Sequence, residues 1–158
     1  IIIMGLFSRK HKSSTKSATE VPPTVAKVVP AAAPVAQVPH YSFKSENYQV
    51  AEGIQEILKG ILEGRILEIF DKYYHKDIVM YEKGDSTNRV GKAANRIAEE
   101  NFLKNATFHE ARVEKLIIDG NNTAYQMYMD FTYGGHRVQK TQWAMQEWKD
   151  GLVIKEEF

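Results

Sequence analysis

All five prolines of this 158-residue chain lie within its first 40 residues. Proline removes a backbone donor and, when repeated, favours extended polyproline conformations, so neither a helix nor a central strand runs easily through this stretch. The pattern predicts that residues 1–45 are a disordered tail, first basic and then rich in Pro, Ala and Val. Residues 46–158 then form one folded domain, long enough to bury a core.

The charge is divided between these two parts. Residues 1–40 carry five basic side chains and one acidic side chain, whereas the remaining 118 residues carry 16 basic and 19 acidic ones. The acidic balance of the folded part disfavours nucleic acid as a partner. No apolar run approaches the roughly 20 residues needed to cross a bilayer. We therefore expect a cytoplasmic protein without stable membrane anchoring, although the basic tail is also compatible with weak contacts to anionic lipid or nucleic acid.

Residue types missing from the chain exclude several kinds of site. The chain has no cysteine, which excludes disulfides, thiolate metal sites and a cysteine nucleophile. The five histidines are scattered and lack metal-ligand spacing. We expect no metal and no cofactor, so any chemistry has to come from carboxylates, amides and tyrosines.

Hydrophobic periodicity predicts three helices followed by a meander of strands. Apolar residues at three- and four-residue spacing predict helices over 46–62, 66–74 and 91–105, the last with Ala94, Ile97, Ala98 and Phe102 on one side. Period-two stretches predict strands over 77–82, 111–118, 123–133, 137–149 and 152–158. The order indicates an α+β fold: a curved antiparallel sheet with the three N-terminal helices packed on one face.

Three motifs carry a resemblance to a known family. They are GRILEIFDKYYHKDIVMYE at 64–82, Val90-Gly91-Lys92, and WKDGLV at 148–153. In this order and spacing they resemble the SnoaL-like branch of the nuclear transport factor 2-like superfamily. The resemblance covers residues 46–158 and implies a cone whose concave face holds the helices and a pocket. It also implies that the last strand is cut short at Phe158.

The resemblance also decides which face of the long strands lines the cone. Alternate residues of a strand share a face, but periodicity alone does not say which face is inside. The pocket acid of ketosteroid isomerases falls at Ala144, which places Gln142 and Gln146 on the inner face. The residues expected to contact a ligand are Tyr74, Met80, Met127, Met129, Gln142, Gln146 and Trp148.

Two glutamates are candidate catalytic groups. Glu82 aligns with the general base of ketosteroid isomerases, and a dry cone would raise its pKa. The alternative is a solvated glutamate at the end of a strand. Glu156 would be a second inner carboxylate, or it belongs to the exposed charged run 155–157.

The opposite face of the sheet carries an apolar stripe of Tyr128, Trp143 and Met145. Such a stripe usually marks an interface, and relatives dimerise through this face, so we expect a homodimer.

Two functions remain open from the sequence. The oxyanion donors of ketosteroid isomerases are missing, because their positions fall near Ile57 and at Ala144, and this disfavours steroid-type enolisation. One hypothesis is a domain that binds an apolar small molecule with a carbonyl or hydroxyl group, and acts as an isomerase, cyclase or dehydratase with a pocket glutamate as general acid or base. The other is a non-catalytic ligand-binding or dimerisation module tethered by its tail.

Overall fold

The structure is a computed structural model, and it describes residues 48–84 and 88–158. The predicted tail, residues 1–45, lies outside the described residues. Within the described ranges the chain forms three helices and six strands. In chain order these are α1 (Tyr48–Leu62), α2 (Ile66–Tyr73), β1 (Tyr74–Tyr81), β2 (Arg89–Val90), α3 (Lys92–Asn105), β3 (Ala106–Asp119), β4 (Asn122–Tyr133), β5 (His136–Lys149) and β6 (Leu152–Glu157).

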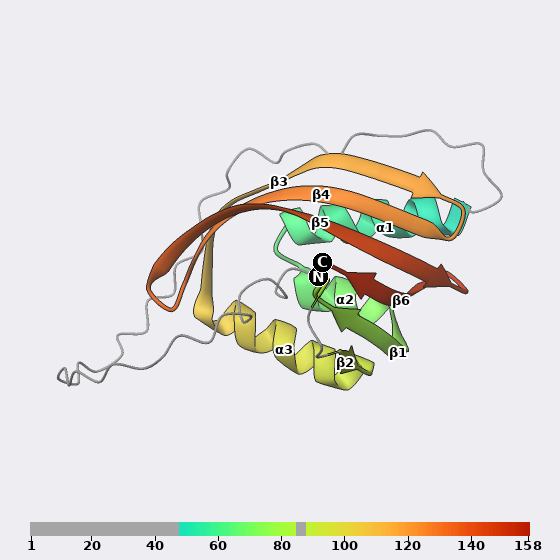
Figure 1. Cartoon of the computed structure of the whole chain (residues 1–158), viewed down its shortest axis with the longest axis horizontal. Coiled ribbons are helices and arrows are strands. Elements are labelled where there is room, and N and C mark those ends of the chain that lie inside the picture. The colour runs from blue at the N-terminus through green and yellow to red at the C-terminus, as the bar shows by residue number, and fades with distance from the viewer. Residues whose placement is uncertain (1–47, 85–87) are drawn as a thin grey trace.

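The strands form one sheet in the order β2-β1-β6-β5-β4-β3. Figure 1 shows β3, β4 and β5 arching over α1, with α2, α3 and the short strands β1 and β2 beneath the arch. The predicted α+β class, with helices on the concave side of a curved sheet, is confirmed. The sheet is mixed rather than purely antiparallel, however, because β6 returns beside β1 and runs parallel to it, whereas the other neighbouring pairs are antiparallel.

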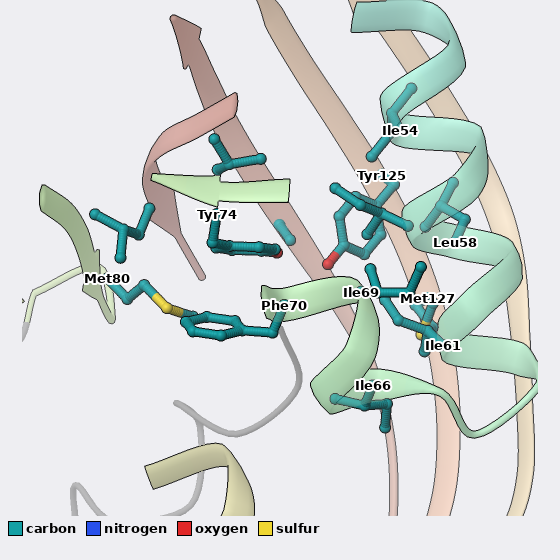
Figure 2. Close-up of a cluster of buried hydrophobic side chains, with 14 of the residues drawn as sticks. Ile54, Leu58, Ile61, Ile66, Ile69, Phe70, Tyr74, Met80, Tyr125 and Met127 are labelled. Carbon is teal, nitrogen blue, oxygen red and sulfur yellow. The ribbon is translucent and has the colours of Figure 1, made fainter. Parts of the chain in front are cut away.

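The core fills the space between α1, α2 and the inner sheet face. One side of α1 buries Ile54, Ile57, Leu58 and Ile61, at the spacing that keeps them on a single helix face. Figure 2 shows Ile54, Leu58 and Ile61 meeting Met127 and Tyr125 from the sheet and Ile69 from α2. Burying a side chain of this size stabilises the fold by about 1.5–3 kcal/mol, so α1 is held mainly by this contact.

Helix α3 differs from its sequence prediction. Phe102 is buried as expected, but Ile97 is 59% exposed, and the helix buries Asn95 and Glu99 instead. Residues 95, 99 and 102 are spaced four and three apart, so they share one face. Asn95 fits inside because its side-chain amide donates to the carbonyl oxygens of Arg89 and Gly91, at 3.1 and 2.9 Å. The buried face of α3 is therefore partly polar.

Three strands also differ from the sequence prediction, and of these β3 begins at Ala106, five residues earlier than predicted. β1 begins at Tyr74, three residues earlier than the alternating pattern predicts, and its pairing with β6 is irregular between Tyr74 and Val79. β2 has two residues, too few to show a period of two, so the pattern gave no signal for it. β2 matters for the site because its pairing with β1 sets Arg89 opposite Met80.

The helices α1 and α2 approach so closely that a glycine is required at position 60 of α1. A Cβ at Gly60 would lie 2.1 Å from Cγ1 of Ile69 and 2.6 Å from its Cδ1. Both distances are far below van der Waals contact. The 11-residue segment from Gly60 to Phe70 therefore packs tightly only because position 60 has no side chain.

We predict that Gly60→Ala destabilises the protein by about 1–3 kcal/mol, the usual cost of overpacking a core. The same change at an unconstrained site inside a helix would stabilise it by about 0.5–1 kcal/mol. Chemical denaturation measures the difference. Lys59→Ala, at the exposed neighbouring position, is the matched control and should change stability little. The double variant Gly60→Ala/Ile69→Ala should be less destabilised than the sum of its single changes, because the clash is removed; strict additivity would contradict the prediction.

Candidate functional site

A row of directly opposed residues crosses the sheet on its inner face. Arg89 on β2 lies opposite Met80 on β1, and Met80 lies opposite Glu156 on β6. Glu156 in turn lies opposite Gln146 on β5, which lies opposite Thr123 on β4. Because side chains opposite one another in a sheet point to the same side, this register gathers polar groups from distant parts of the chain at one level of the cone.

Glu156 is the centre of this row and is completely buried, with 0% of its surface exposed. The Gln146 side-chain amide donates to its Oε1 at 2.8 Å, and the Tyr125 hydroxyl donates to the same oxygen at 3.3 Å. The Tyr74 hydroxyl donates to Oε2 at 3.0 Å. Glu156 therefore faces inward, which excludes its placement in an exposed charged run.

The donors to Glu156 are themselves held in place. Burial raises the pKa of both Tyr74 and Tyr125 well above the ordinary value, and the negative charge of Glu156 raises it further, so both phenols keep their protons. The Tyr74 ring stacks on the Phe70 ring (Figure 2), and the two ring centroids are 4.5 Å apart. This stacking keeps the Tyr74 hydroxyl aimed at the carboxylate.

The network continues on the far side of Gln146. The Thr123 hydroxyl donates to Gln146 Oε1 at 2.8 Å, and the Trp148 indole N–H donates to the Thr123 oxygen at 3.0 Å. This end of the cone is filled: a Cβ at Gly53 on α1 would lie 2.7 Å from a ring carbon of Trp148. Thr123, Gln146 and Trp148 thus form a buried polar chain that orients the Gln146 amide.

A second acidic group, Glu99 on α3, approaches the same interior. Its side chain is 2% exposed. Burial raises the pKa of Glu99, the negative charge of Glu156 adds to that effect, and the positive charge of Arg89 opposes it. Glu99 also raises the pKa of Tyr74 and Tyr125, which shows that its charge reaches the Glu156 network.

Burial along β5 shows where the inner face becomes accessible. The inner residues Ala144, Gln146 and Trp148 are buried, whereas Lys140 and Gln142 are half-buried. The Lys140 ammonium donates to the side-chain oxygen of Gln142. The inner face therefore changes along one strand from closed and packed to partly open and polar.

Glu82 belongs to this more open end. It follows β1 directly. The backbone pairing of β1 with β6 continues on both sides of Glu82: the Lys83 N–H donates to the Phe158 carbonyl at 2.9 Å, and the Phe158 N–H donates to the Tyr81 carbonyl at 3.0 Å. Glu82 is half-buried. Its negative charge acts on Lys140 and on Arg89, raising the pKa of each against the lowering caused by burial. The half-buried end thus has an ammonium in contact with an amide, and the charge of the Glu82 carboxylate acts on that ammonium.

The remaining residues expected to contact a ligand lie deeper. Met80, Met127 and Met129 are buried in the core cluster. Tyr74 lies inside the core as well, rather than at an accessible edge. The structure therefore separates the predicted set into a half-buried pair, Glu82 and Gln142, and a buried remainder around Glu156.

Sequence reasoning missed several polar residues of this interior. Lys140 lies two residues before Gln142 and therefore on the same face of β5, so strand periodicity could have identified it. Glu99 and Asn95 share a helix face with Phe102, but their polarity argued for the solvent side. Tyr125 and Thr123 share one face of β4 with Met127, so knowing which face is the inner one would have been enough to place them inside. For Arg89 there was no signal, because β2 is too short.

The outer sheet face exposes two of the three residues expected to form an apolar stripe. Trp143 is 38% and Met145 is 45% exposed, and Ile117 on β3 is exposed beside them. The Arg112 guanidinium covers the Tyr128 ring at 3.8 Å from its centroid. A surface groove of about 280 Å³ runs over this face and includes Ile117 and Met145 among its lining residues.

Two further features are absent from residues 48–84 and 88–158. Over these ranges, no three His, Asp or Glu side chains gather in an arrangement that would hold a metal ion. None of the helices in these ranges is long and apolar enough to span a membrane.

Comparison with known proteins places this fold. A family profile described as a SnoaL-like domain matches residues 46–158. No functionally curated protein matches the chain. Among solved structures, a candidate SnoaL-like polyketide cyclase or carbohydrate phosphatase from Mesorhizobium loti is 26% identical with a TM-score of 0.63, and the match covers 69% of this chain and 97% of that protein.

Two more distant structures share the fold. An epoxide hydrolase of the LEH type from M. tuberculosis is 16% identical with a TM-score of 0.60, covering 72% of this chain and 83% of its own. A candidate ketosteroid isomerase from Kribbella flavida is 20% identical with a TM-score of 0.56, covering 69% of this chain and 75% of its own.

The buried Glu99 predicts a specific pH dependence. Because its pKa in the folded protein is raised above the ordinary value of 4.5, ionisation of Glu99 at neutral pH opposes folding, and that loss disappears as the pH falls below about 4.5. Glu99→Gln should therefore raise the melting temperature at pH 7 and leave it nearly unchanged near pH 4. Thermal unfolding across this range measures the difference. Glu68→Gln, at an exposed position on α2, should show no such trend, and a Glu99→Gln variant that is less stable at pH 7 would contradict the prediction.

Proposed function

The chain belongs to the SnoaL-like domain family, and from this membership we propose that it binds an apolar small molecule carrying a carbonyl group on the inner face of the cone, with Glu82 as general acid or base. The observation that carries the proposal is the change along the inner face of β5, from buried at Gln146 to half-buried at Gln142. A ligand entering at the half-buried end would meet Glu82 and Gln142 first. The buried methionines behind them supply the apolar surroundings.

The two glutamates then have different roles. Glu156 accepts hydrogen bonds on both of its oxygens from Tyr74, Gln146 and Tyr125. Such donors stabilise the charged carboxylate and fix its position. Glu156 therefore serves to orient the inner polar network, and Glu82, at the accessible end, is the group that exchanges a proton with the ligand.

Gln142 and Glu82 together suit proton transfer next to a carbonyl. The amide N–H of Gln142 would donate to the carbonyl oxygen, while Glu82 removes a proton from the neighbouring carbon. The candidate polyketide cyclase from Mesorhizobium loti supports this ligand class, since polyketides are built from ketone units.

We predict that the protein accelerates exchange of the α-protons of 2-tetralone, an apolar bicyclic ketone, with deuterated water. A positioned general base typically contributes about 10²–10⁴-fold, so Glu82→Gln should reduce the protein-dependent rate by about 100-fold or more. Nuclear magnetic resonance of the ketone follows the exchange. Glu68→Gln is the matched control and should retain the full rate. Exchange no faster than in buffer, together with no saturable binding of 2-tetralone, would contradict the proposed function.

A second candidate function, a dimerisation module, is supported by the outer face. Trp143 and Met145 lie two residues apart on the outer face of β5, and both expose large apolar side chains. Exposed apolar residues that gather on a single sheet face favour contact with a second copy of the chain. This function is compatible with ligand binding because it uses the opposite side of the sheet.

We predict that Trp143→Glu converts a homodimer into monomers, because a buried unpaired carboxylate at an interface is strongly unfavourable. Sedimentation velocity measures the mass of the particle. Ile97→Glu is the matched control: Ile97 is also exposed and apolar, but it lies on α3, so that variant should remain dimeric. Dimers that persist in Trp143→Glu, or monomers in the unchanged protein, would contradict the role of this face.

A further inference from the structure

Resting on the proposed carbonyl ligand, we propose that Lys140 is a nucleophile that forms a Schiff base with the ligand's carbonyl carbon. The residue lies on the inner face of β5, in register opposite the buried Met129 of β4. It is half-buried, at the same open end of the cone as Gln142 and Glu82. Its amine would therefore meet the ligand at the carbonyl.

The position of the amine is defined by a specific contact. The Lys140 ammonium donates to the side-chain oxygen of Gln142, two residues further along the same inner face. Lysine side chains are long and flexible, so a fixed acceptor limits the positions that the nitrogen takes. Gln142 thus acts as a positioning residue for Lys140.

The surroundings also favour the reactive form of the amine. Burial lowers the pKa of Lys140, and the negative charge of Glu82 opposes part of that change. A lowered pKa increases the fraction of neutral amine, which is the form that attacks a carbonyl. Lys155 differs, because its surface ion pair with Glu147 raises its pKa.

A Schiff base would also answer the main chemical objection to proton transfer at this site. Enolisation develops negative charge on the carbonyl oxygen. The phenols of Tyr74 and Tyr125 donate to Glu156, so the donor proposed for that oxygen is the neutral amide of Gln142. A protonated imine accepts that charge itself, because its nitrogen is cationic. Lys140 as nucleophile and Glu82 as base would therefore form a complete unit for removing the proton on the neighbouring carbon.

The step balances with the groups present. The neutral amine nitrogen forms a bond to the carbonyl carbon, and one amine proton passes through Glu82 to the carbonyl oxygen, which gives a carbinolamine. The second amine proton follows the same route to the hydroxyl, which leaves as water while the carbon–nitrogen double bond forms. Glu82 ends in the protonation state in which it began. A solvent proton then converts the imine into its cationic form.

The test traps this imine. The protein is incubated with 2-tetralone and sodium borohydride, whose hydride reduces the imine to a stable secondary amine, and peptide mass spectrometry then locates the adduct. We expect a single adduct on Lys140 and none in Lys140→Arg, because a guanidinium does not form the imine. Lys149→Arg, on the outer face of the same strand, is the matched control and should carry the adduct on Lys140 in full.

A second measurement separates this proposal from the proposed function. Lys140→Arg should slow α-proton exchange of 2-tetralone by about 100-fold, similar to Glu82→Gln, because both groups act in one sequence. If exchange depends on Glu82 but persists in Lys140→Arg without an adduct, Lys140 is not the nucleophile and the proposed function stands. If 2-tetralone neither binds nor exchanges its α-protons, both the proposed function and the role of Lys140 as nucleophile fail.

A third measurement follows the amine directly. Mild reductive methylation with ¹³C-formaldehyde labels the lysines, and the chemical shift of each methyl group reports its titration. The Lys140 pKa should lie below that of the surface lysines, and Glu82→Gln should lower it further, because the carboxylate that raises it is gone. A Lys140 that titrates with the surface lysines in both proteins would overturn the proposal.

Discussion

A carboxylate buried at the middle of the sheet imposes the most demanding condition in this structure. An ionised group removed from water is very costly unless hydrogen bonds replace its hydration. Glu156 meets this condition with donors from three other strands: Tyr74 on β1, Tyr125 on β4 and Gln146 on β5. The register of the sheet is therefore tied to the chemistry of one side chain, since a slip by one residue would turn every donor to the opposite face.

This condition explains why the interior is divided into two parts. Around Glu156 the hydrogen bonds are made between protein groups and the packing is tight, as the contact between Gly53 and Trp148 shows. Toward Gln142 and Lys140 the inner face is half-buried, and the charged groups there have access to solvent or to a ligand. A rigid polar interior that ends in a more open polar region is the arrangement expected of a site that holds one group still while another exchanges protons.

Fold and site differ in how far the sequence determines them. The helices and long strands follow from local periodicity, and the motifs at 64–82 and 148–153 identify the family, so α+β architecture was accessible from the chain alone. The complete hydrogen-bonding of Glu156 was not, because Tyr74 is 82 residues away along the chain and reaches Glu156 through the parallel pairing of β1 with β6. Helix α3 shows the same limit: Ile97 was expected inside, but the helix turns Asn95 and Glu99 inward because backbone carbonyls and the polar interior accept them.

In the two proposed functions, each face of β5 has its own purpose. Side chains alternate across a strand, so Lys140, Gln142 and Gln146 face the interior while Trp143 and Met145 face outward from positions between them. A partner that covers the outer face would bury the backbone of the strand that carries the inner groups and restrict its motion. The site would then be positioned on a strand packed from both sides, although no residue of the outer face contacts the ligand. If both proposed functions hold, dimerisation and ligand binding are linked through the stiffness of β5 rather than through shared residues.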